Sequence, residues 1–498
     1  MKKTLALPLL AIYLLAKGNI LDQALVNFSV SQGQPTSGAE ESNRFGIFAK
    51  QVKDIYTADW ITALEDWNFG NTNRIRSAFP TSTSREKLHK LFVAYKAALE
   101  KELTTGTWIN KKTAGIWQDK KLWANGYVKK LLVDGGSELF VHTDYHADIA
   151  SLLAELKDLQ TKGYLEKENG FKINRGAHPN FYMFFLGDFI DRGAYGIEVL
   201  YALISLALTN PTRVFLIKGN HETGAIEPKN FYNELKNKFE AVFAIKIADL
   251  FYNQIAPLLP DAIFVGAGDA DKNFALLCHA GPQIGGPALV ADLRALLKSP
   301  EQVAYQQVPK IDANGVITEY SICKAADFAT IVDTRLTATR FNKNSSQYIW
   351  TDFSAENLAH PTASSGRGGG VLKLGKAFTE SWLKDVLSQP GFTVKYILRG
   401  HQNNGVGDLG QRIRMGQGVS RLWDDSANLV AQGDYFLHTL CPGCVCTFLV
   451  TPDTTYGKAA RKSHPYDVYG ILQTNSWNLV IHQLDLKKIF DLTGIQIV

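Results

Sequence analysis

The sequence has little of what marks several large classes of protein. It holds only 5 cysteines in 498 residues, an odd number and too few for a disulfide-stapled scaffold. No uninterrupted apolar run reaches the ~18 residues of a membrane-spanning helix, so we expect no transmembrane segment. The charges nearly balance, with 53 Lys and Arg against 48 Asp and Glu, and the net charge of +5 does not indicate nucleic-acid binding.

Hydrophobic residues, in contrast, are plentiful. They form 45 % of the chain and include 27 Phe, 19 Tyr and 9 Trp, whereas charged residues form only 20 %. This composition excludes a largely disordered chain and supplies material for a sizeable core. The length predicts two to four domains.

The first residues have the pattern of a secretory signal peptide. Lys2 and Lys3 precede an apolar stretch from residue 5 to 16, and small residues follow at Ala16 and Gly18. We therefore expect a signal peptide over 1–18 and an exported protein, or otherwise a soluble cytoplasmic one. The alternative is a buried first helix or strand, although Pro8 would interrupt a helix.

Two further segments precede the main domain. Residues 19–45 are mostly polar and predict a linker, and residues 46–135 predict a helical N-terminal extension. The clearest helix there runs over 84–103, with apolar residues at helical spacing and Ser84 as its N-cap.

From residue 136 the pattern changes to short apolar runs that end in polar clusters. Five such runs are ELFVHTDYH, FYMFFLGDFIDRG, RVFLIKGNHE, FALLCHAGP and YILRGHQ, and segments such as 197–208 between them favour helices. Strands alternating with helices predict a layered α/β fold. Because functional groups gather beyond the carboxyl ends of strands in such sheets, we expect these polar clusters to converge.

The polar residues at these ends are suited to metal binding and phosphoryl chemistry. The set comprises Asp144, His146, Asp188, Asn220, His221, His279 and His401. Carboxylate, imidazole and amide ligands suit Mn, Fe or Zn, and one carboxylate can bridge two ions. Arg192, Arg367 and Arg399 offer fork-shaped donors for a phosphate dianion, although a structural role for Arg399 is equally open.

In their order along the chain, these motifs resemble the signature of the PPP family of metallophosphoesterases. The resemblance rests on DYH (144–146), GDFIDRG (187–193), GNHE (219–222), HAG (279–281) and RGHQ (399–402). It extends over 136–498, and it implies a β-sandwich of two sheets flanked by helices, with insertions between the motifs. It does not extend to the N-terminal extension.

The resemblance also implies a role for each motif residue. Two divalent ions, with Mn favoured and Fe or Zn accepted, would be held by Asp144, His146, Asp188, Asn220, His279 and His401, with Asp188 bridging. His221 would be the general acid and Asp191 would orient it. Arg192, Asn220, Arg367 and Tyr456 would bind the substrate phosphate, and a dimetal-bound hydroxide would attack phosphorus without a phosphoenzyme.

The sequence departs from the family pattern near several ligands. Thr143 and Ala147 stand where the family has glycine, and we expect Thr143 to crowd the turn. Lys218 replaces an arginine before GNHE, and HAGP replaces HGG. None of these changes removes a ligand, but the insertions that rim the site would set substrate choice.

The resemblance implies a protein phosphatase acting on phosphoserine and phosphothreonine, with phosphotyrosine left open. The alternatives are a small-molecule phosphoesterase, such as a dinucleoside polyphosphate hydrolase, and an inactive phosphatase-fold scaffold. The seven motif positions are intact, which disfavours the scaffold.

Some reactive residues have no place in these motifs. We expect a cluster of free thiols at Cys441, Cys444 and Cys446. In an exported protein, Cys441 and Cys444 could instead pair as a disulfide. Histidines outside the motifs, such as His142, are interpreted as structural.

Overall fold

A computed structural model of the chain describes residues 82–105, 107–108, 127–167, 171–193, 195–223, 228–268, 272–284, 287–298, 303–306, 309–311, 317–320, 347–363, 371–402, 409, 412, 416–423, 429–432, 435–449, 451 and 466–485. The predicted signal peptide, the predicted linker, Arg367 and Tyr456 lie outside these residues. None of the helices in the described ranges is both long and apolar enough to cross a bilayer.

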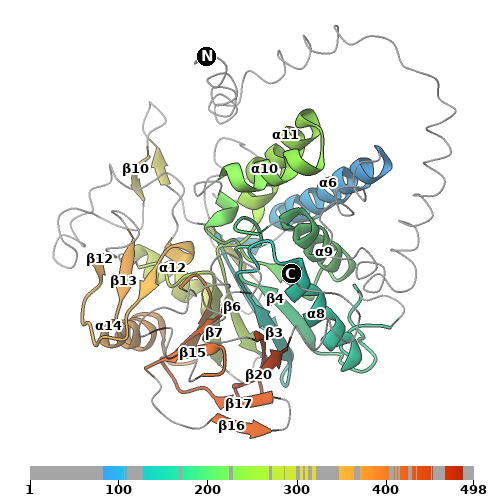
Figure 1. The fold of residues 1–498 in the computed structure, drawn as a ribbon. Coiled ribbons are helices and arrows are strands. Elements are labelled where there is room, and N and C mark those ends of the chain that lie inside the picture. The colour runs from blue at the N-terminus through green and yellow to red at the C-terminus, as the bar shows by residue number, and fades with distance from the viewer. Residues whose placement is uncertain are drawn as a thin grey trace, which may run out of the picture. The chain divides into compact units, whose positions relative to one another are not determined.

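Two large sheets form the centre of the fold (Figure 1). One has eight strands in the order β1-β8-β2-β6-β7-β14-β18-β15, and the other has seven in the order β16-β17-β20-β19-β3-β4-β5. The eight strands are β1 (Thr107–Trp108), β8 (Val303–Gln306), β2 (Tyr127–Val133), β6 (Ala262–Ala267), β7 (Asn273–Cys278), β14 (Thr393–Arg399), β18 (Val445–Phe448) and β15 (Val419–Leu422). The seven are β16 (Leu429–Gln432), β17 (Tyr435–Thr439), β20 (Asn478–Leu484), β19 (Asp467–Gln473), β3 (Glu138–His142), β4 (Phe181–Phe185) and β5 (Val214–Leu216).

Helices and smaller elements complete the described chain. The helices are α6 (Ser82–Thr105), α8 (Ile149–Thr161), α9 (Gly196–Thr209), α10 (Pro228–Lys238), α11 (Ala241–Asp249), α12 (Pro287–Lys298) and α14 (Lys376–Ser381). Short 3-10 or π-helical segments are η3 (His221–Thr223), η4 (Leu250–Ile255), η5 (Ala256–Leu258), η6 (Gln347–Ile349) and η7 (Trp382–Leu387). Minor strands are β9 (Pro309–Ile311) with β10 (Ile317–Tyr320), and β11 (Asp352–Phe353) and β12 (Thr362–Ala363) beside β13 (Leu372–Leu374).

Alternating side chains hold the two sheets together. In β3, Leu139 and Val141 join a core shared with residues of the eight-stranded sheet, such as Val265 and Leu277. Phe140, between them, belongs instead to a second core on the other face of its sheet. This period of two is the one that a strand buried on both faces requires. The layered α/β fold with two sheets flanked by helices, predicted from the sequence, is confirmed.

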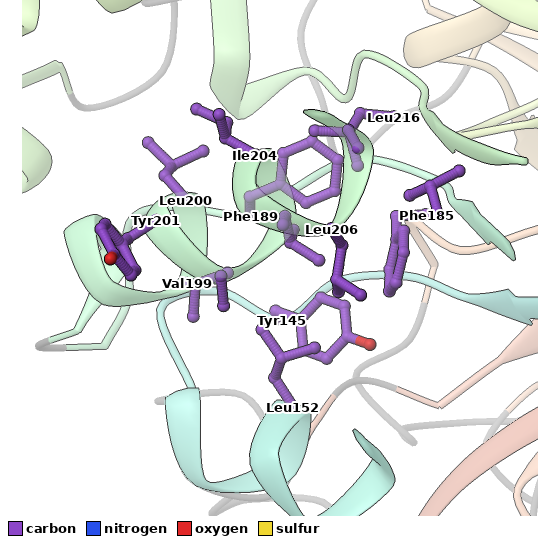
Figure 2. Packing of buried hydrophobic residues seen from close by; sticks show 14 of the residues in the cluster. Tyr145, Leu152, Phe185, Phe189, Val199, Leu200, Tyr201, Ile204, Leu206 and Leu216 are labelled. Atoms are coloured by element: carbon purple, nitrogen blue, oxygen red, sulfur yellow. The ribbon is translucent and has the colours of Figure 1, made fainter. Parts of the chain in front are cut away.

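Helices cover the outer face of the seven-stranded sheet. Figure 2 shows side chains of α9, including Val199, Ile204 and Leu206, in the same buried cluster as Phe185 of β4 and Leu216 of β5. Helix α9 is buried along most of its length, which explains why its sequence is apolar on nearly all sides. This layer holds β4 and β5 rigid and thereby positions the loops that follow them.

The predicted N-terminal extension differs from the structure at its end. A helix is present where 84–103 predicts one, beginning two residues earlier at Ser82. Residues Tyr127–Val133, however, form strand β2 inside the eight-stranded sheet and not part of a helical extension. They pair with β6 and β8, so these pairings with distant residues override the local helical pattern.

Candidate active site

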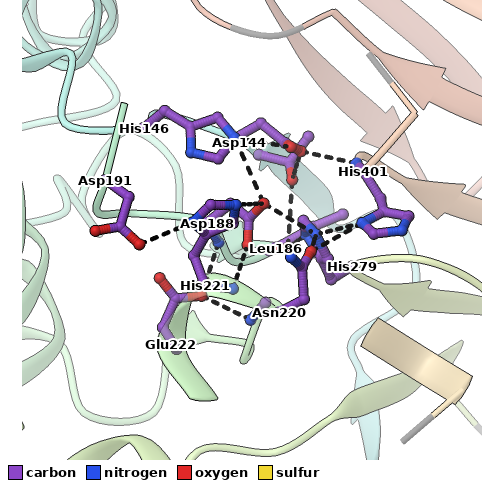
Figure 3. Close-up of polar contacts among 12 residues, drawn as sticks. Asp144, His146, Leu186, Asp188, Asp191, Asn220, His221, Glu222, His279 and His401 are labelled. Carbon is purple, nitrogen blue, oxygen red and sulfur yellow. Dashed lines mark hydrogen bonds and ion pairs between the residues drawn. The ribbon is translucent and has the colours of Figure 1, made fainter. Parts of the chain in front are cut away.

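The loops after five strands bring the predicted residues together. Asp144 and His146 follow β3, Asp188 follows β4, and Asn220 and His221 follow β5 of the seven-stranded sheet. His279 and His401 follow β7 and β14 of the eight-stranded sheet. All seven side chains lie within one cluster, shown with its polar contacts in Figure 3. The cluster therefore forms where the carboxyl ends of strands from both sheets meet.

The backbone of these loops adopts unusual conformations. Positive φ angles of 45 to 69° occur at Asp144, His146, Ala147, Asp188, Asp191, Arg192 and His401. Such angles are strained for residues with a Cβ atom, and this strain concentrates at functional sites. The angle at Ala147 also accounts for the glycine that the family pattern has there, because glycine adopts it without strain.

Asp188 is at the centre of the cluster. Its Oδ2 lies 3.2 Å from His279 Nε2, 3.5 Å from His146 Nε2 and 4.0 Å from His221 Nε2. Asp188 belongs to two groups of potential metal ligands, one with His146 and His221 and the other with Asp144 and His279. A carboxylate shared in this way has the position that a bridging ligand requires.

The second group extends to an amide and another imidazole. Asn220 Oδ1 lies 2.8 Å from His279 Nε2 and 2.9 Å from His401 Nδ1. The backbone N–H of His401 donates to Asp144 Oδ2 over 3.0 Å. The two sheets are thus connected through the predicted ligands themselves.

The imidazole contacts fit divalent metal ions. His279 Nδ1 lies 2.9 Å from the carbonyl of Leu186, and His146 Nδ1 lies 3.2 Å from that of Ile190. If each Nδ1–H is donated to its carbonyl, the Nε2 lone pair faces Asp188 Oδ2. A lone pair facing a carboxylate oxygen is unfavourable without a cation between them, and outer hydrogen bonds of this kind are the rule for histidine metal ligands.

Burial and mutual charge shape the electrostatics of the cluster. Burial alone would raise the pKa of the Asp188 carboxyl, but the imidazoles of His279 and His221 hold it well below its usual range. Burial lowers the pKa of His146 to about 4, so this ring is neutral and able to bind a metal at neutral pH.

His221 and Asp191 form a separate pair beside the cluster. His221 Nδ1 lies 2.8 Å from Asp191 Oδ2, and the other carboxylate oxygen accepts the backbone N–H of Phe231 over 3.0 Å. Burial lowers the pKa of His221, but Asp188 and Asp191 outweigh this effect and raise it above its usual value. The ring is therefore suited to carrying a proton near neutral pH.

Glu222 is a further site residue, whose role becomes clear only from its contacts. Its buried carboxylate accepts backbone N–H groups of Asp188, Phe189 and Gly219, each over 2.8 Å. It therefore fixes the loop after β4 against the loop after β5 and orients Asp188. The signal for this role was present in the sequence, because Glu222 ends the GNHE motif.

Other residues near the ligands have specific roles. Thr143, which stands where the family pattern has glycine, donates its hydroxyl to Asp144 Oδ2 over 2.6 Å. Arg399 is fully buried, donates to Gln402 Oε1 over 2.7 Å and lies over the ring of Phe353, so its role is structural. Arg192 is half-buried and directly follows Asp191 in the site loop.

Comparison with known proteins agrees with the motifs. The profile of the calcineurin-like phosphoesterases matches residues 139–404, more than half of the chain. This protein belongs to the calcineurin-like phosphoesterase family. The predicted resemblance to the PPP metallophosphoesterases is thereby confirmed.

Individual relatives match over shorter segments. The chain is 39 % identical over 109 residues to the serine/threonine-protein phosphatase PP2A-like PPG1 of Candida albicans, covering 21 % of this chain and 24 % of that one. It is 35 % identical over 102 residues to the phosphatase of the same name from Saccharomyces cerevisiae, covering 20 % of this chain and 28 % of that one. The chain thus spans less than a third of the length of these relatives.

A solved structure is similar over a longer range. A serine/threonine phosphatase of Saccharomyces cerevisiae, described as similar to human PP5, aligns with a TM-score of 0.42 and 14 % identity. The alignment covers 80 % of this chain and 90 % of that chain.

Proposed function

We propose that this phosphoesterase is a metal-dependent protein phosphatase that hydrolyses phosphoserine and phosphothreonine esters. The observation that carries the proposal is the His221–Asp191 pair beside a ligand set centred on Asp188. The segment matches to serine/threonine phosphatases support the choice of substrate. The intact ligand and acid positions argue against an inactive scaffold.

The residues of the chain divide the reaction between them. The divalent ions would be held by Asp144, His146, Asp188, Asn220, His279 and His401, and when bound they would supply Lewis-acid charge and lower the pKa of water at the site. Arg192, on the same loop as Asp191, binds the phosphate oxygens through its guanidinium. His221 donates its proton to the departing serine or threonine oxygen, and Asp191 keeps the ring oriented and protonated.

The leaving group provides the sharpest test of this assignment. An alkoxide needs a proton to depart, whereas nitrophenolate departs without one. We expect His221→Ala to lower kcat on a phosphoserine peptide by roughly 100- to 10,000-fold and to lower kcat on p-nitrophenyl phosphate much less. His360→Ala, which changes an exposed histidine, is the matched control and should leave both rates unchanged.

The assay would use the full chain loaded with Mn²⁺, with metal content measured in each variant. Matched phosphoserine, phosphothreonine and phosphotyrosine peptides and diadenosine tetraphosphate would be compared. Preference for the dinucleotide would favour the small-molecule alternative. Bound metal without turnover of any substrate would favour the scaffold.

A further inference from the structure

A second group of ligating side chains lies outside the catalytic cluster. It consists of His142 at the end of β3, Glu155 on α8 and Asp467 at the start of β19, and β3 and α8 are both labelled in Figure 1. One ligand atom from each residue lies within 4.8 Å of the others. The exposed fractions of these residues are 0 %, 0 % and 1 %. None of them takes part in the proposed phosphatase reaction.

The polar atoms of this group are not satisfied by hydrogen bonds. Among the residues that the structure describes, no hydrogen bond of ordinary geometry reaches five of these buried atoms: both ring nitrogens of His142, Oε1 of Glu155 and both carboxylate oxygens of Asp467. Within the described part of the chain, no lysine or arginine pairs with either carboxylate. Buried polar atoms almost always have a partner, and buried carboxylates need a compensating charge.

The pKa of Glu155 reflects the same deficit. Burial, reinforced by the charge of Asp467, raises the pKa of the Glu155 carboxyl well above its usual range. The charge of Asp467 therefore opposes the ionisation of Glu155. A divalent cation between them would remove this opposition.

The two distances from His142 to the carboxylates are close to those of a small tetrahedral ion site. His142 Nε2 lies 3.3 Å from Glu155 Oε1 and 3.7 Å from Asp467 Oδ1. An ion bound at about 2.0–2.2 Å in a tetrahedron holds its ligand atoms roughly 3.3–3.6 Å apart. The hydroxyl of Tyr145 donates to Glu155 Oε2, which orients this carboxylate and leaves Oε1 to the ion.

We propose that His142, Glu155 and Asp467 bind a zinc-type divalent ion at a structural site separate from the catalytic metals. One imidazole and two carboxylates suit such an ion, and the two negative charges balance its charge. His142 precedes the catalytic ligand Asp144 by two residues. The ion therefore ties the start of the loop that carries Asp144 and His146 to α8 and β19.

Metal analysis of the full chain can separate this site from the catalytic one. The background variant carries Asp188→Asn with His279→Asn, which removes the residue shared by both catalytic groups and one of its partners. After dialysis against a weak chelator, we expect this background to retain about one zinc ion per chain. Adding Asp467→Asn should remove that ion. Adding Asp158→Asn, a change to another carboxylate of α8, should not.

Equal zinc content in the background and in its Asp467→Asn derivative would overturn the proposal, and so would a background without zinc. If the variants fail to fold, anomalous diffraction from wild-type crystals grown with zinc decides the question. A zinc peak between His142 and Asp467 supports the proposal. Peaks at the catalytic ligands alone would overturn it, leaving the three side chains as a proton-sharing cluster. These outcomes do not depend on whether the protein dephosphorylates peptides.

Discussion

At the scale of single residues, the position of the Asp144 carboxylate depends on the lack of a side chain at Gly400. A Cβ atom at Gly400 would lie 1.8 Å from Asp144 Oδ2 and 2.4 Å from Thr143 Oγ1. Both distances are too short for a non-bonded contact, so a side chain does not fit there. Gly400 immediately precedes the ligand His401, and its backbone N–H donates to the carbonyl of His279. The absence of a side chain at residue 400 therefore allows the two sheets to approach through their ligand loops.

Gly400→Ala should displace the Asp144 carboxylate and weaken metal binding. We expect a loss of roughly 10- to 100-fold in metal affinity and a comparable fall in kcat/KM, because the change moves a ligand without removing it. Calorimetric titration of the stripped protein with Mn²⁺ would measure the affinity. Gly135→Ala is the matched control, since a Cβ there meets nothing within 4 Å. Equal affinities in the two variants would contradict this account of Gly400.

At the scale of elements, helix α6 is part of the phosphoesterase core. One side of the helix is buried and belongs to the hydrophobic cluster that covers the seven-stranded sheet. Its residues, at helical spacing, are Leu88, Phe92, Tyr95, Leu99 and Leu103. The ring of Phe92 packs edge-on against Phe251 of η4, with centroids 6.4 Å apart. This region lies N-terminal to the segment that the family profile matches, yet its packing joins it to the same domain.

Phe92→Ala should therefore destabilise the whole domain and not only the helix. We expect the free energy of unfolding to fall by about 3–5 kcal/mol, the usual cost of removing a buried phenylalanine side chain. Val93→Ala, one residue along and 43 % exposed, should change it by less than about 0.5 kcal/mol. Guanidinium unfolding followed by tryptophan fluorescence measures both. A small effect of Phe92→Ala would show that α6 is not docked in solution.

At the scale of the whole molecule, we expect stability to depend on pH through a histidine outside the catalytic ligand set. His482 of β20 stacks on Tyr469 of β19, with ring centroids 4.7 Å apart, and its Nδ1 lies 3.2 Å from Lys162 Nζ. Burial, together with the charge of Lys162, lowers the pKa of His482 from 6.5 to about 4. In the unfolded chain this histidine takes up a proton first, so acid favours unfolding.

The contribution of His482 is complete above pH 6.5 and declines as the pH falls towards 4. Between pH 7 and pH 5, the wild type should lose about 2 kcal/mol of unfolding free energy more than His482→Phe does. Urea titrations at several pH values, with metal concentration held constant, measure this difference. Parallel pH profiles for the two proteins would contradict the assignment, whatever the offset between them.

The sequence alone determined the alternation of strands and helices and the identity of the candidate ligands. Each ligand lies within four residues of the end of an apolar strand, so a short stretch of chain carries both the strand and the ligand. The roles of His221 and Asp191, in contrast, are implied by the resemblance of GNHE and GDFIDRG to the PPP signature. The ligands could be predicted because each one and its strand are neighbours in the sequence.

Tertiary structure decided which groups lie next to those residues. Packing places β2 inside the sheet and brings three backbone N–H groups to the carboxylate of Glu222. It also buries Arg399 against Gln402 and Phe353. The approach of His142 to Glu155 and Asp467 joins segments distant along the chain, and no local pattern encodes it. Side chains acquire such partners only when water is excluded around them, which happens when the sheets and helices assemble.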